Sequence, residues 1–168
     1  MNQLQIGNTT YDIKFNHRFY DNIITDFAKK HKNSNSNGFN NLIQGLIDED
    51  PDAIITAYRA AIEDKHKPTV SEVSAALDDA GVFDDKDAYS KVFKEIKSSG
   101  FLAGKIRHLL KLMYNDWKNS EEGLKVVMEN SDKSDKDYKN DVRQAKMETA
   151  IAKKAYELMK KILEELGK

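Results

Sequence analysis

Polar and apolar residues alternate at the N-terminus, in two short runs separated by turn residues. The runs cover residues 3–6 and 9–15, and Gly7-Asn8 lies between them. A two-residue loop that begins with glycine suits a primed β-turn, in which glycine takes the positive φ, so we predict a β-hairpin here. The apolar side chains would form two matching faces: Leu4 and Ile6, and Tyr11, Ile13 and Phe15. Because an isolated hairpin is marginal in water, it has to pack against helices or another chain.

Beyond residue 15 the apolar residues recur at spacings of three and four, which is typical of helices with one buried face. Local signals mark the boundaries: Asp50-Pro51 favours a helix start, Lys67-Pro68 a break, and Gly81 and Gly100 helix ends. Ser120-Glu121-Glu122 either begins a new helical turn or marks a bend. The predicted helices cover residues 19–32, 39–47, 51–62, 71–80, 85–99, 101–117 and 141–166.

Residues 130–140 are almost without apolar side chains and are rich in Ser, Asp, Lys and Asn, so we interpret them as an exposed linker. The predicted fold is mostly α, a multi-helix bundle of about six or seven helices with a short N-terminal β-hairpin. We predict a helical domain over residues 1–118. Residues 119–168 then supply the polar linker and a C-terminal amphipathic helix, which can pack on the same domain.

Composition narrows the class of protein. The chain has 168 residues, enough for one hydrophobic core, and a formal net charge of −1, which gives no bulk attraction for nucleic acid. It contains no cysteine, which excludes disulfides, thiol catalysis and zinc sites that need sulfur. No apolar run approaches the roughly 20 residues that span a bilayer. These features favour a cytoplasmic protein without membrane contact.

The sequence contains no recognisable catalytic or metal-binding motif. The four histidines lack the i,i+4 pairing of a helical metal motif, and no phosphate-binding loop is present. The acidic clusters fail the calcium-loop pattern: counted from Asp85, the position that needs Gly is Ser90 and the one that needs Glu is Ile96. We therefore predict no catalytic residues, no metal and no cofactor.

Two features leave a binding function open. Residues 69–97 resemble a helix-turn-helix, which makes a small helical DNA-binding or adaptor regulatory protein the alternative function. The second of these helices, however, opens with Asp84, Asp85 and Asp87, which would repel phosphate.

The C-terminal apolar stripe of Ile151, Ala155, Leu158, Ile162 and Leu166, widened by Ala152, Met159 and Leu163, has two interpretations. It either folds back on the core or docks into a groove on a partner or on another copy. The candidate partner-binding residues are Leu102, Ile106, Leu109, Ile151, Leu158 and Ile162.

Six features follow one another in order along residues 4–112. The first is the hairpin sequence at 6–15, and an aromatic-rich helix at 19–27 and a helix opening with glycine at 38–47 come next. A D-P helix start at 50–54, a K-P-T-x-x-E helix start at 67–73 and an F-x-x-I segment within 93–101 complete the series. This order resembles that of the tail assembly chaperones of long-tailed phages and prophages of Gram-positive bacteria, whose hairpin reads I-N-G-x-x-Y-x-L-x-F, with the Asn-Gly order reversed here.

The resemblance implies a non-enzymatic role in building the phage tail. Such chaperones are thought to coat the tape-measure protein, keep it soluble, help recruit tail-tube subunits and leave before the virion is complete. The implied partners are therefore the tape-measure and tail-tube proteins, with a homo-oligomer as a further option, and the implied location is the host bacterial cytoplasm. Many of these phages also make a longer form by ribosomal frameshifting, and this chain would then be the shorter product.

Overall fold

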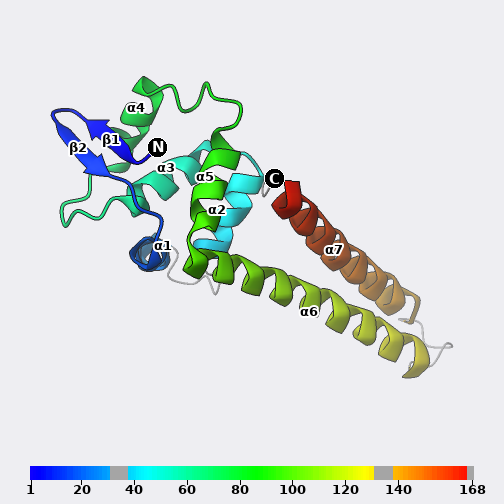
Figure 1. Cartoon of the computed structure of the whole chain (residues 1–168). Helices are drawn as coiled ribbons and strands as arrows, with labels where there is room; N and C mark the ends of the chain where they lie inside the picture. The colour runs from blue at the N-terminus through cyan, green and yellow to red at the C-terminus, as the bar shows by residue number, and fades with distance from the viewer. Residues whose placement is uncertain (31–37, 131–137, 166–168) are drawn as a thin grey trace. The chain divides into compact units, whose positions relative to one another are not determined.

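The computed structural model describes residues 1–30, 38–130 and 138–165; the side chains of 26–30 and of 130 lie outside that description. The described residues form a two-stranded hairpin and seven helices, which confirms the predicted fold class (Figure 1). The elements are β1 Gln3–Ile6, β2 Thr9–Asp12, α1 His17–Lys30, α2 Gly38–Ile47, α3 Pro51–Ala61, α4 Val70–Asp79, α5 Ala88–Ser98, α6 Gly100–Asn130 and α7 Tyr138–Glu165.

Internal contacts divide the chain into two compact units, Met1–Lys105 and Ile106–Lys168, which we call unit 1 and unit 2. The division falls within α6, as does the boundary at residue 118 that the sequence suggests. That boundary stays a prediction.

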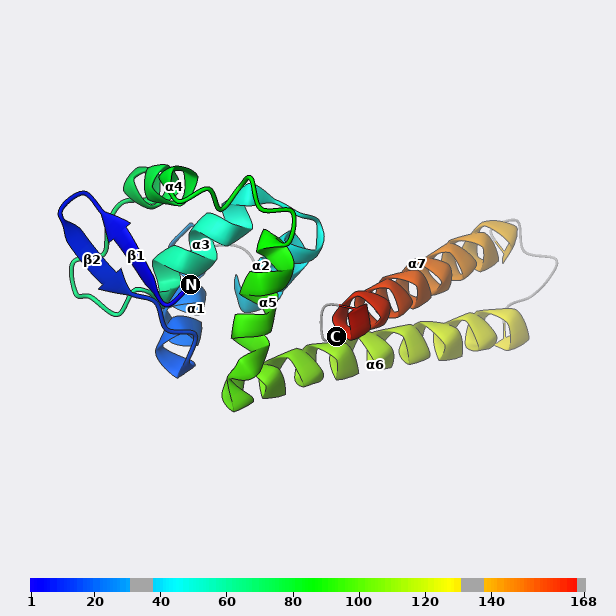
Figure 2. The ribbon, with the colours of Figure 1, turned by 45° about the horizontal axis from the view of Figure 1, so that its top comes forward.

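The N-terminal hairpin of unit 1 has the predicted turn. Its strands pair antiparallel from Gln3 opposite Asp12 to Ile6 opposite Thr9, and Gly7 has a φ of +58°. Glycine at the first loop position with a positive φ fits a type II′ turn, which matches the twist of the strands. The hairpin is anchored where the Lys14 N–H donates to the Ala61 carbonyl over 3.0 Å, and it lies beside α4 (Figures 1 and 2).

Helix α3 is the centre of unit 1, because α1, α2, α4 and α5 all contact it. It begins as predicted: the Asp50 carboxylate accepts a hydrogen bond from the Asp52 N–H at 3.0 Å, and Pro51 occupies the first turn. Small side chains allow close packing on α2, since a Cβ added to Gly45 would lie 2.8 Å from the Cβ of Ala53.

The core of unit 1 is aromatic and aliphatic. Phe19, Phe39 and Phe93 are fully buried, and Phe15 meets Phe19 edge to face with ring centroids 5.1 Å apart. Each such side chain stabilises the fold by about 1.5–3 kcal/mol relative to an exposed position. The hydrophobic periodicity of the predicted helices therefore identifies the core of unit 1 correctly. The side chains of residues 26–30 and the whole of residues 31–37, which hold the end of the predicted helix 19–32 and its connection to the next helix, lie outside the description.

Helix α4 ends at the glycine that the sequence predicts, and it begins one residue before the predicted start. Thr69 and Glu72 form a reciprocal capping box at its start. At its end Gly81 has a φ of +66°, and the N–H groups of Gly81 and Val82 donate to the carbonyls of Asp78 and Leu77. This is a Schellman motif, in which glycine provides the left-handed residue.

Three helix boundaries differ from the predictions by three residues or more. Helix α5 begins at Ala88 rather than at residue 85, because the Asp85 carboxylate and carbonyl accept hydrogen bonds from the N–H groups of Asp87 and Ala88 and hold a turn there. Helix α6 continues through Ser120 to Asn130 without a bend. Helix α7 begins at Tyr138, so residues 138–140 of the predicted linker are helical, while 131–137 lie outside the description.

Candidate functional site

Unit 2 consists of an antiparallel helical hairpin. Trp117 of α6 stacks on Tyr156 of α7 with ring centroids 5.7 Å apart, and the Thr149 hydroxyl donates to the Ser120 carbonyl over 3.0 Å. As the residue number rises along α6 it falls along α7, so the two helices run in opposite directions. Tyr114 adds an edge-to-face contact with Tyr156 at 5.4 Å, which completes an aromatic cluster.

The residues between the two helices form what we call the inner seam. They are buried or half-buried and recur at alternating spacings of four and three, the pattern of a coiled-coil interface. On α6 they are Ile106, Leu110, Met113, Trp117, Ser120, Leu124 and Val127. On α7 they are Tyr138, Val142, Ala145, Thr149, Ala152, Tyr156, Met159 and Leu163.

A second apolar stripe on α7 is mostly exposed to solvent. It consists of Met147, Ile151, Ala155, Leu158 and Ile162, and we call it the outer stripe. Met147, Ile151 and Leu158 are 59%, 60% and 50% exposed, Ala155 is exposed and Ile162 is half-buried. Three large apolar side chains along one side of the helix are thus exposed to solvent, and a contiguous apolar patch of this kind often marks an interaction surface.

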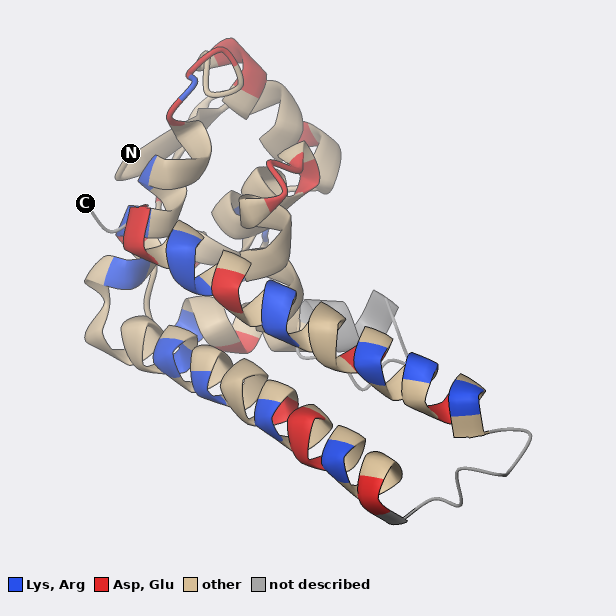
Figure 3. Ribbon diagram, turned by 90° about the vertical axis from the view of Figure 1, so that its right-hand side faces the viewer, with Lys and Arg blue, Asp and Glu red and all other residues tan. Residues whose placement is uncertain are grey.

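Charged side chains occupy much of the remaining surface of α7. Figure 3 shows Lys and Arg interspersed with Asp and Glu along α6 and α7. Along α7 the pairs are Lys153–Glu157, Lys160–Glu164 and Lys161–Glu165, with N–O distances of 3.8, 4.0 and 3.7 Å. Exposed pairs of this kind contribute only about 0.3–0.5 kcal/mol each, so their main effect is to keep the helix hydrated.

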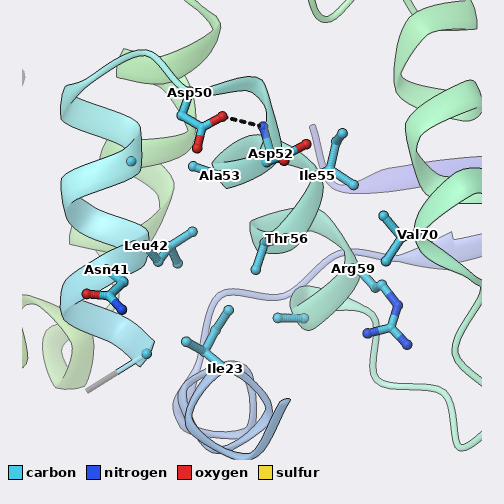
Figure 4. Close-up of a pocket in the computed structure, with 13 residues that line it drawn as sticks. Ile23, Asn41, Leu42, Asp50, Asp52, Ala53, Ile55, Thr56, Arg59 and Val70 are labelled. Atoms are coloured by element: carbon cyan, nitrogen blue, oxygen red, sulfur yellow. Dashed lines mark hydrogen bonds between the residues drawn. The ribbon is translucent and has the colours of Figure 1, made fainter. Parts of the chain in front are cut away.

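A cavity of about 280 Å³ in unit 1 offers little chemistry. It lies among α1, α2 and α3, with Leu42 and Ile55 in its wall (Figure 4). Two of its polar groups have structural partners: Asp50 caps α3, and the Nε of Arg59 donates to the Pro68 carbonyl over 2.9 Å. Within the described ranges, no three His, Cys, Asp or Glu side chains are grouped as a metal site would require.

The segment that resembles a helix-turn-helix carries acidic groups at the start of α5. Asp85 accepts hydrogen bonds from the Lys91 ammonium and the Asp87 N–H, and these lower the pKa of its carboxyl. The group therefore stays ionised at neutral pH. A negative charge at the start of a recognition helix would oppose DNA binding.

Comparison with known families decides between the remaining interpretations. A family described as phage tail assembly chaperone protein, TAC, matches residues 3–111. The chain belongs to this family. The match confirms the resemblance found in the sequence, and it extends from the hairpin through the first part of α6. Neither the curated proteins nor the solved structures that were compared contain a significant match.

The six candidate partner-binding residues of this tail chaperone do not form one surface. Leu102, Ile106 and Leu109 are buried, with exposed fractions of 0%, 5% and 8%. The other three, Ile151, Leu158 and Ile162, lie together on the outer stripe of α7. A partner can reach the exposed side chains of this second group without unfolding the chain.

Sequence reasoning missed Met147, Leu112 and Val126, three of the exposed apolar residues of the tail chaperone. Met147 continues the outer stripe one turn toward the N-terminus of α7, at the same four-residue spacing as Ile151 and Ala155, so the signal was present. Leu112 and Val126 of α6 are 42% and 55% exposed, and only the antiparallel pairing of α6 with α7 makes them relevant. In the part of the chain that the structure covers, no helix has the length and apolar character of a membrane span.

Proposed function

We propose that this tail assembly chaperone binds apolar helices of the phage tape-measure protein, keeps that protein soluble and helps recruit tail-tube subunits to it. It acts in the host bacterial cytoplasm, needs no catalysis, and leaves before the virion is complete. The family membership carries the proposal. The exposed outer stripe of α7 supports it, because a soluble chain that leaves Ile151 and Leu158 in water has surface available for an apolar partner.

The chemistry of the surface is suited to holding a partner without aggregating. Large apolar side chains provide about 1.5–3 kcal/mol each on full burial, while the Lys and Glu pairs on the opposite side of α7 remain hydrated. A tape-measure helix covered in this way would exchange an apolar exterior for a charged one. Self-assembly of the chaperone along such a long partner is compatible with this role.

Co-expression with the tape-measure protein of the same phage tests the proposal. We expect the tape-measure protein to be insoluble alone and to form a soluble, stoichiometric complex with the tagged chaperone in buffer without nucleotide or divalent ions. If the chaperone purifies alone while the tape-measure protein precipitates, the proposed function is wrong. If binding needs ATP or a divalent ion, passive shielding is the wrong mechanism.

A further inference from the structure

The two flanks of the helical hairpin of unit 2 differ: one carries the outer stripe of α7, and the other is mostly charged. In an antiparallel pair, corresponding flanks of the two inner seams lie on the same side. The flank that carries the outer stripe of α7 is therefore the flank that carries Leu112 and Val126 of α6. We call these seven residues, the outer stripe together with Leu112 and Val126, the client face.

The opposite flank is charged. The Nζ atoms of Lys118 and Lys153 lie 4.2 and 5.5 Å from the centroid of the Trp117 ring, which places an α6 lysine and an α7 lysine together on that side. Other charged side chains at the same helical positions are Arg107, Lys111, Glu121, Lys125, Lys146, Glu157, Lys160 and Glu164, with Tyr114 and Met128 between them.

We propose that the client face binds one amphipathic α-helix of the tape-measure protein, whose acidic edge lies against Lys154 and Lys161. This inference rests on the proposed function and specifies the contact surface and the chemistry of the bound segment. The spacing of the outer stripe selects a helix as the ligand, because the inner seam of α7 has closely similar spacing and holds α6. From Met147 to Ile162 the stripe extends about 22 Å, enough for roughly four turns of a bound helix.

Charges at the borders of the client face set the orientation of the bound helix. Lys154 and Lys161 are exposed along the outer border of α7, and Asp116 and Glu122 are exposed on α6. Lys161 has Glu165 at 3.7 Å, whereas no ion pair joins Lys154 to another described residue. A client helix with acidic residues along one edge and basic or polar residues along the other complements both borders.

A second copy of the chain fits the client face less well. Antiparallel pairing of two outer stripes about their midpoint would place Lys154 of one copy against Lys154 of the other. If the outer stripe packed on α6 of another copy, it would contact the polar residues Asp116, Asn119 and Glu122. Only Leu112 and Val126 of that helix would be apolar partners. Like charges in the first case and unmatched polar groups in the second favour a different protein as the ligand.

Two neighbouring residues on opposite flanks of α7 provide the test. In co-expression with the tape-measure protein, we expect Ile151→Asp to lower the amount that copurifies by about tenfold or more, because a carboxylate would replace a buried apolar contact. Ala150→Asp, an exposed position on the charged flank, should copurify as much as the wild type. Circular dichroism and thermal unfolding establish that both variants fold. Equal copurification with the two folded variants would overturn the inference.

Charge reversal tests the acidic edge separately. Lys154→Glu combined with Lys161→Glu should weaken the complex, and more strongly at low than at high salt, because salt screens the interaction. The matched control is Lys153→Glu combined with Lys160→Glu, on the charged flank, which should have little effect. If both pairs weaken binding equally, the assignment of the acidic edge is wrong.

The outcomes separate the two proposals. If the wild type fails to solubilise the tape-measure protein, the proposed function is wrong. If the wild type succeeds and the folded Ile151→Asp variant binds equally well, only the client face is wrong. If light scattering shows a wild-type oligomer that Ile151→Asp converts to a monomer, the client face is occupied by another copy and the proposed ligand is wrong.

Discussion

Two helices of unit 1 end in the same backbone motif with different residues at its left-handed position. At the end of α4 this residue is Gly81, with a φ of +66°; at the end of α2 it is Glu49, with a φ of +55°. There the Asp50 N–H donates to the Gly45 carbonyl over 2.8 Å, the same six-residue closure that Val82 makes to Leu77. A side chain with a Cβ is strained in this region of φ, whereas glycine is not.

The two cap positions should therefore respond to substitution in opposite directions. We expect Glu49→Gly to raise the free energy of unfolding by about 0.5–1 kcal/mol and Gly81→Ala to lower it by about 1 kcal/mol. Urea titration followed by circular dichroism measures both. A loss of stability in Glu49→Gly would show that the side chain of Glu49 contributes more than its backbone strain costs.

A carboxylate joins the residues after the hairpin to those after α3. Glu63 accepts hydrogen bonds from the Asn16 amide at 2.8 Å and the Lys14 ammonium at 3.1 Å, and these lower the pKa of its carboxyl below the ordinary 4.5. A lowered folded-state pKa stabilises the protein above pH 4.5, and this contribution is lost as the pH falls through the folded-state pKa.

Glu63→Gln should thus lower the free energy of unfolding at neutral pH, and lower it by a smaller amount in acid. We expect about 0.5 kcal/mol at pH near 7, in keeping with a partly exposed group, and a smaller difference below about pH 4. Urea unfolding at both pH values, with the wild type alongside, measures the difference. A cost that is the same at both pH values would mean that ionisation of Glu63 has no part in the contact.

At the scale of elements, the approach of α2 to α3 depends on a glycine. The Cβ added by Gly45→Ala would lie 2.8 Å from the Cβ of Ala53, whereas the Cβ added by Gly123→Ala in α6 meets nothing within 4 Å. Both changes raise helix propensity by about 0.5–1 kcal/mol, but overpacking costs about 1–3 kcal/mol at the first site.

Gly45→Ala should accordingly lower the melting temperature by about 2–4 °C, and Gly123→Ala should leave it unchanged or raise it. Differential scanning fluorimetry compares the two directly. If Gly45→Ala melts at or above the wild-type temperature, α2 and α3 can move apart to accommodate the added methyl group without a loss of stability.

Helix positions were predictable from the sequence because their signals are local. The cap at Asp50-Pro51 and the glycine at 81 are each recognised within a few residues, and the structure has both. The start of α5 was misplaced because Asp85 holds a turn through its own carboxylate, which competes with helix formation.

The candidate site was only partly predictable, because α7 carries two overlapping apolar stripes. Periodicity groups Leu158 with Met159 as apolar, but only the pairing of α6 with α7 shows that Met159 is buried and Leu158 is exposed. The same pairing places Ile106 in the inner seam and leaves Ile151 outside it. The face that an element presents to a partner is a tertiary property, and a single sequence does not contain it.

At the scale of the molecule, the burial of apolar side chains is concentrated in unit 1. Of the buried hydrophobic side chains in the described residues, all but Ile106, Leu109, Met159 and Leu163 precede residue 106. The family match ends close by, at residue 111.

A chain of residues 1–111 should therefore fold without the rest but fail to hold the tape-measure protein. We expect cooperative thermal unfolding of this fragment and no copurification in the co-expression assay, because the client face is missing. If the folded fragment still forms a soluble complex, the binding surface lies in unit 1.

The stacked contact between α6 and α7 also gives the protein an internal optical reporter. Trp117 is the single tryptophan of the chain, and its ring packs on Tyr156 at the contact between the two helices. Indole emission therefore comes from that one place, and its wavelength shifts when the ring gains or loses water. Opening of the hairpin, or a partner settling against it, can be followed in real time by intrinsic fluorescence, without a label and without altering a residue.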